Sequence, residues 1–187
     1  MQRKLPGICG ILAPVIAFIA ISLSIHMHPW FSWRGNALSD LGALGVPYKT
    51  IFNMGLIITA LVSLVFVSGL PEIIKDKISR AGILFFVISI VFLLGIGIFP
   101  EGTSLHGSVS VAFYTFATVS LVLIGIGLMW KRSERKYGLF TLLLLGTALF
   151  LCFGFSWSAI AIPESIGAGA IGIWSIVFGL RILYERT

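Results

Sequence analysis

Charged residues are scarce in this chain: Asp, Glu, Lys and Arg make up 11% of its 187 residues, against about 25% in an average soluble domain. Hydrophobic residues make up 58%, and the mean hydropathy is +1.06. A soluble domain of this size buries only about two-thirds of the surface that its unfolded chain exposes, so much of this apolar surface would stay in water. The composition therefore excludes a soluble enzyme, a nucleic-acid-binding protein and a disordered chain, and it predicts a protein that resides in a lipid bilayer.

Cysteine is also scarce, and the two that occur are Cys9 and Cys152. Their spacing indicates neither a disulfide framework nor a cysteine-based metal site. The sequence also lacks paired histidine ligands of the H-E-x-x-H kind. No motif therefore identifies a cofactor or a metal for this protein.

Long apolar runs, in contrast, are abundant. A transmembrane helix needs about 20 predominantly apolar residues, and the sequence predicts six such spans, at about residues 7–27, 50–70, 81–99, 108–130, 138–160 and 166–184. The spans leave only short connections between them. Residues 1–187 are therefore predicted to form a single transmembrane domain of the all-α class.

Basic residues gather on one side of these spans. Eleven of the 13 do so, namely Arg3, Lys4, Lys75, Lys77, Arg80, Lys131, Arg132, Arg135, Lys136, Arg181 and Arg186. Because short loops rich in Lys and Arg stay in the cytoplasm, both termini are predicted to be cytoplasmic, as in a multi-pass protein of the cell membrane. The net charge of +6 is then a topology signal, and nucleic acid is excluded as a partner.

The opposite, external side carries the polar residues that are capable of chemistry. Its first loop, at about residues 28–49, is the longest connection and contains Ser39 and Asp40. These two residues fit two interpretations. They cap a helical turn, or they belong to a polar site that faces the interior of the bundle.

The fourth span adds a polar stripe on the same side. His106, Ser110 and Tyr114 recur at four-residue spacing, so one face of the helix carries all three. An unsatisfied polar group is costly in hydrocarbon, so the stripe is expected to face protein or a water-filled cavity.

We therefore predict an external polar pocket between the first, second and fourth spans, with Ser22 among the residues that close it. The candidate residues are Ser39, Asp40, Asn53, His106, Ser110, Tyr114, His26 and Glu101. Within this set, Asp40 and His106 are expected to lie within direct or one-water hydrogen-bonding reach. The alternative is that these groups simply bond one helix to the next.

Three functions are open to the external residues: metal binding, serine hydrolysis and transport. The histidines, with Asp40 and Glu101, are of types that bind metals, but they form no metal-binding signature. Ser104 lies near His106, but the segment is not a G-x-S-x-G elbow, which a serine hydrolase of that type would need. A transporter is the third possibility, although few charges lie within the spans and no ion pathway is evident.

The sixth span carries a stripe of small residues at alternating four- and three-residue spacing, formed by Ala168, Gly172, Ser175 and Gly179. Small residues let two helix backbones approach closely in a membrane. The stripe predicts packing against another helix of the same bundle, and a homo-oligomer interface is the alternative.

Two short elements resemble a known family. Residues 38–42 (LSDLG) are followed by Pro47 and by residues 51–53 (IFN), which open a span, and residues 98–100 (IFP) precede His106 at the head of the next span. These elements resemble DUF998, a family of uncharacterised prokaryotic multi-pass membrane proteins. More distantly, they are similar to the eukaryotic FRAG/DRAM/Sfk group.

The resemblance implies a membrane-lipid theme rather than a reaction. The prokaryotic family has no established activity, and the eukaryotic group is associated with lipid remodelling, phosphoinositide-kinase scaffolding and autophagy. Carried over to this sequence, the resemblance implies that Ser39, Asp40 and His106 are the functional positions.

Two functions of different classes follow as expectations. In the first, a non-enzymatic protein binds a lipid headgroup or a membrane partner through the external pocket. In the second, an intramembrane lipid hydrolase or transferase uses Asp40 and His106 as an acid–base pair, with or without a metal. The expected partners are the bilayer itself and a lipid ligand.

Overall fold

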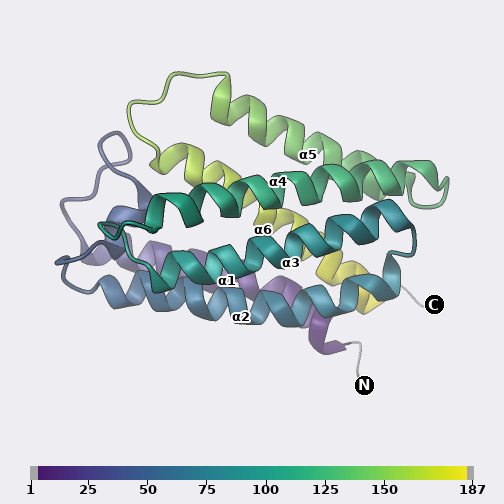
Figure 1. Cartoon of the computed structure of the whole chain (residues 1–187), viewed down its shortest axis with the longest axis horizontal. Coiled ribbons are helices and arrows are strands. Elements are labelled where there is room, and N and C mark those ends of the chain that lie inside the picture. Colours follow the sequence, from purple (N-terminus) through teal and green to yellow (C-terminus); the bar gives the residue numbers. More distant parts are fainter. Residues whose placement is uncertain (1–3, 185–187) are drawn as a thin grey trace.

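The structure, a computed structural model, describes residues 4–184. Within this range the chain forms six α-helices that run back and forth along one bundle, and it forms no strand (Figure 1). Each helix is long and apolar enough to cross a membrane. The helices are α1 Lys4–Met27, α2 Lys49–Ile73, α3 Lys77–Ile98, α4 His106–Trp130, α5 Arg135–Phe153 and α6 Ala161–Tyr184. The prediction of an all-α bundle with six spans is confirmed.

The helix ends differ from the predicted spans for identifiable reasons. α3 begins at Lys77, ahead of the predicted residue 81, because Asp76 caps it with a side-chain hydrogen bond. The fifth span is predicted to run to residue 160, and this is wrong, since α5 ends at Phe153 with Gly154 as its C-cap. Residues 154–160 form a loop that carries no charged residue, so the sequence does not mark the end of the span.

The two ends of the bundle have different character. α1 starts and α6 finishes at the same end, which we call the terminal end (Figure 1). The other end, called the long-loop end, holds the connections at residues 28–48, 99–105 and 154–160. Basic residues cluster in and beside the terminal-end connections, residues 74–76 and 131–134. The cytoplasmic location of the terminal end stays a prediction from this distribution.

The helices pack mainly against their neighbours in sequence. α1 to α4 each contact the next, α6 lies against α1, and α5 lies against α4 and α6. Toward the long-loop end α5 diverges from α4 (Figure 1), and Phe150 and Phe153 are exposed there. The small-residue stripe of α6 packs inside the chain, since a Cβ atom at Gly179 would lie 2.7 Å from the carbonyl oxygen of Gly7 in α1. A homo-oligomer through this stripe stays a prediction.

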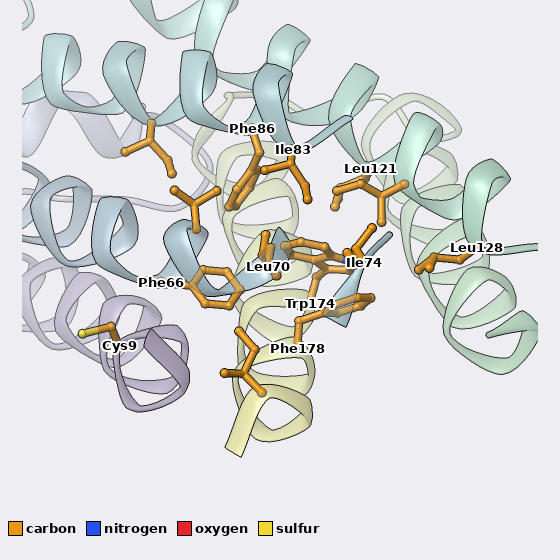
Figure 2. Packing of buried hydrophobic residues seen from close by; sticks show 14 of the residues in the cluster. Cys9, Phe66, Leu70, Ile74, Ile83, Phe86, Leu121, Leu128, Trp174 and Phe178 are labelled. Atoms are coloured by element: carbon orange, nitrogen blue, oxygen red, sulfur yellow. The ribbon is translucent and has the colours of Figure 1, made fainter. Parts of the chain in front are cut away.

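A cluster of buried hydrophobic residues joins the helices, and an aromatic cluster around Trp174 lies within it (Figure 2). Trp174 of α6 is fully buried and stacks on Phe178, with ring centroids 4.4 Å apart. Its ring also meets Phe66 of α2 and Phe86 of α3 at steep angles, and its indole N–H donates to the Thr141 hydroxyl of α5 at 3.1 Å. One side chain thus joins four helices.

A buried ion pair fixes the last turn of α6. Arg181 is 5% exposed, pairs with Glu134 just before α5, and lies 4.1 Å above the ring centroid of Tyr137. It also donates to the carbonyl of Ile73 in α2 at 3.4 Å. Because a buried charge is stable only when it is paired, these contacts hold α2, α5 and α6 together at the terminal end.

Candidate functional site

A cavity of about 100 Å³ lies mainly in the long-loop half of the bundle. Its lining comes from α1, α2, α3, α4 and α6 and from a short 3-10 helix, η1 (Leu38–Gly42). Along α6 the lining extends from Glu164 to Ser175, which at 1.5 Å per residue is about 16 Å. The cavity is therefore long and narrow, and it starts at the polar loops and ends inside the apolar bundle.

The cavity wall is apolar along most of its length. Ile21, Leu56 and Phe113 are typical of it. Phe86 lines its inner end and contacts Trp174, so the aromatic cluster closes the cavity toward the terminal end.

Four hydroxyl groups interrupt the apolar wall toward the inner end, and two of them, Thr59 and Ser89, donate to carbonyls of their own helices. Ser63 of α2 and Ser175 of α6 line the cavity, and within residues 4–184 neither makes a hydrogen bond. Ser175 is only 6% exposed. These two hydroxyl groups can therefore form hydrogen bonds with a molecule that enters the inner end of the cavity.

A set of linked side chains, which we call the polar rim, lies at the outer end: Ser39, Glu101, His106 and Ser110. Nε2 of His106 lies 3.1 Å from a carboxylate oxygen of Glu101 and 3.2 Å from the hydroxyl of Ser110. The same carboxylate oxygen accepts a hydrogen bond from the Ser39 hydroxyl at 3.3 Å. Nδ1 of His106 is bonded to the carbonyl of Phe99 at 2.8 Å. Both ring nitrogens of His106 therefore have oxygen atoms within hydrogen-bonding distance.

Glu164 brings the last helix to the same end of the cavity. Its Oε2 accepts a hydrogen bond from the N–H of Leu38 at 2.6 Å, which joins α6 to η1. The hydroxyl of Tyr114, on α4, donates to the backbone carbonyl of Glu164 at 3.1 Å. The candidate set omits Glu164, because no spacing in the sequence connects it to the fourth span. Its position beside Pro163 at the start of the last helix is the only local signal.

Asp40 has a local role in the structure. Its carboxylate accepts hydrogen bonds from the N–H of Ala37 at 3.0 Å and from the side-chain amide of Asn36 at 2.9 Å, so it caps η1. Within residues 4–184 no direct hydrogen bond joins Asp40 to His106, and Glu101 lies beside the His106 ring instead; a contact through one water stays a prediction. The reason is that the turn of η1 directs the Asp40 carboxylate back to its own loop.

The first and second helices contribute differently from the expectation. Asn53 of α2 is 8% exposed and donates to the carbonyl of Gly42 at 3.0 Å, so it holds η1 on the helix. His26 and Ser22 of α1 are exposed and do not line the cavity. α1 instead contributes apolar residues such as Ile21 to the cavity wall. Residues of α3 and α6 also line the cavity, whereas the predicted pocket lies between the first, second and fourth spans only.

His28 anchors the long loop that carries η1. The side chain is 2% exposed, and its two ring nitrogens lie 2.6 Å from the carbonyl oxygens of Ser24 and Pro47. These two contacts attach both ends of the loop to the C-terminal end of α1, which keeps η1 in place over the cavity.

The polar rim does not have the geometry of a catalytic triad. In a triad the acid orients one imidazole nitrogen while the other faces the nucleophile. Here Glu101 and Ser110 both lie beside Nε2 of His106, and a backbone carbonyl holds Nδ1. Ser104 is exposed and lies outside the rim. Among residues 4–184, no three His, Cys, Asp or Glu side chains converge as metal ligands. Ser39 and Ser110 of the rim line the cavity, so the rim can present two hydroxyl groups to the polar group of a ligand.

The fold and the site together define a multi-pass helical membrane protein with an apolar cavity under a polar rim. Within that class, the chain belongs to the DUF998 family, described as "Protein of unknown function", whose family model matches residues 11–181. The match includes the greater part of every helix, so the predicted membership is confirmed. No curated protein and no solved structure gives a significant match.

Proposed function

We propose that this protein binds a single-chain amphiphile, with the apolar chain in the cavity and the polar head at the rim. The observation that carries the proposal is the cavity. It is about 16 Å long, its wall is mainly apolar, and its outer end includes Ser39, Ser110 and Glu164. An amphiphile has polar and apolar parts in the same order.

The volume of the cavity favours one chain. A cavity of about 150 Å³ holds a benzene molecule, and this one measures about 100 Å³. Spread over its length, that volume admits part of one chain but not two chains side by side. A two-chain lipid would have to leave one chain in the bilayer.

The head group decides which amphiphile is retained. A lipid chain that moves from the bilayer into the protein gains little, because the lipid tails around it are as apolar as the cavity wall. Hydrogen bonds to the polar head gain more, since the alternative partners are few at that depth. The exposed indoles of Trp30 and Trp33, in the same loop as η1, are of the type that settles at headgroup level.

Native mass spectrometry of gently solubilised protein tests the proposal. Ser175→Phe fills the inner end of the cavity, and Ile173→Phe is its matched control, since Ile173 lies two positions away on the same helix and is 50% exposed. We expect the wild type and Ile173→Phe to retain an amphiphile after detergent exchange, and Ser175→Phe to lose it. Equal retention by the two variants would contradict the proposal.

A second pair of variants separates loss of binding from loss of folding. Ala168→Phe narrows the cavity from another turn of α6, and Ala81→Phe makes the same change at an exposed position of α3. If the proposal is correct, Ala168→Phe elutes as a folded protein without the amphiphile. Folded Ala168→Phe that keeps the amphiphile as fully as Ala81→Phe would count against it.

A further inference from the structure

The cavity has one carboxylate in its lining, that of Glu164. One of its oxygens, Oε2, accepts the N–H of Leu38. The other makes no hydrogen bond within residues 4–184 and is not sealed from the surrounding space. The carboxylates of Asp40 and Glu101 do not line the cavity, and both accept hydrogen bonds from their own surroundings. Glu164 is therefore the acid of the cavity lining that has an oxygen left to accept a hydrogen bond from a ligand.

Within residues 4–184 no ion pair joins Glu164 to a basic residue. Neither lysine nor arginine lines the cavity. Arg34 and Lys49, the two basic residues of the long-loop end, form no ion pair within residues 4–184, and His106 faces Glu101. A partly buried carboxylate is stabilised most by a charged hydrogen-bond donor. A ligand with a positively charged head group would supply that donor.

We propose that the head of the bound amphiphile is a primary ammonium group, held by Glu164. The inference rests on the proposed amphiphile binding and names its head group. An ammonium has three N–H donors, and the free oxygen of Glu164 and the hydroxyl oxygens of Ser39 and Ser110 provide three acceptors in one lining. A phosphate head would instead meet acids at Glu164 and Glu101 with no lysine or arginine to neutralise it, which disfavours it.

An independent observation indicates that the cavity is made to be occupied. Ser175, at the inner end, is 6% exposed and has no hydrogen-bond partner within residues 4–184. The Ser175 hydroxyl therefore lies without a hydrogen-bond partner at the end of the cavity opposite Glu164. A molecule that enters at Glu164 and fills the cavity would reach it.

A competition between four matched amphiphiles tests the head group. The purified full-length protein is equilibrated in detergent with equal amounts of dodecylamine, dodecanol, dodecanoate and dodecyl phosphate, and the bound molecules are then extracted and quantified by mass spectrometry. We expect the amine to exceed the alcohol about tenfold, the ratio that a charge-assisted hydrogen bond adds over a neutral one. In Glu164→Gln, whose amide oxygen can still accept from Leu38, the ratio should approach one. In Glu72→Gln, at the terminal end, it should stay as in the wild type.

The outcomes separate the two proposals. If alcohol and amine bind equally in the wild type, or if phosphate is preferred, the ammonium inference is overturned while amphiphile binding stands. If none of the four is retained, or if Ser175→Phe retains them all as the wild type does, the proposed amphiphile binding itself fails. A tenfold preference for amine that persists in Glu164→Gln would remove Glu164 from the site.

Discussion

The contact between Glu101 and His106 makes a quantitative prediction about the polar rim. Glu101→Ala and His106→Ala each remove one partner of a 3.1 Å contact, and their coupling energy is measured from the two single variants and the double variant. A hydrogen bond between ionised groups is worth about 1.5 to 3 kcal/mol. The Glu101 side chain is 40% exposed, against 5% for His106, so solvent screening reduces the expected coupling to about 1 kcal/mol.

The comparison with Asp40 makes this prediction decisive. Asp40 shares no hydrogen-bond partner with His106, so Asp40→Ala and His106→Ala should be additive within about 0.5 kcal/mol. The free energy of unfolding is obtained from reversible denaturant titrations in mixed micelles, followed by tryptophan fluorescence. A larger coupling for the Asp40 pair would refute the described rim.

Three further predictions concern the bundle. Gly179→Leu should destabilise the protein by about 1 to 3 kcal/mol, because its side chain would strike the α1 backbone, whereas Gly169→Leu meets open space and should be nearly neutral in the same unfolding assay. Arg181→Met should cost about 3 to 5 kcal/mol by leaving Glu134 partly buried without its partner, and the double variant with Glu134→Leu should cost less than the sum of the single changes. In a background with both native cysteines replaced, Ser133→Cys should resist membrane-impermeant thiol reagents added to intact cells, since the terminal end is predicted to be cytoplasmic; strong labelling would reverse the orientation.

The number and order of the helices follow from the sequence because an apolar run has few alternatives in a bilayer. The contact between His106 and Ser110 also follows, since residues four apart on a helix are neighbours, and the structure places them 3.2 Å apart. The end of α5 at Phe153 does not follow from the sequence pattern, because residues 154–160 carry no charged residue to mark the end of the span.

The partners of the site residues depend on how the long loops fold, and loops have no periodicity to follow. Asp40 and Glu101 are both acids on the predicted external side, and only the turn of η1 decides that Asp40 caps its own loop while Glu101 meets His106. Glu164 reaches the cavity through a hydrogen bond to Leu38, which is 126 positions away in the chain. Contacts of this kind require the tertiary packing of α6 against α1.

The most direct test of the central claim is to locate the chain of a bound amphiphile. A dodecyl amphiphile with a diazirine at the end of its chain is equilibrated with the protein, activated by light, and mapped by peptide mass spectrometry. We expect adducts on residues at the inner end of the cavity, such as Ser63, Phe86 and Ser175. Adducts confined to outward-facing residues, such as Leu143 and Phe150, would show that the chain lies outside the protein and would contradict the account.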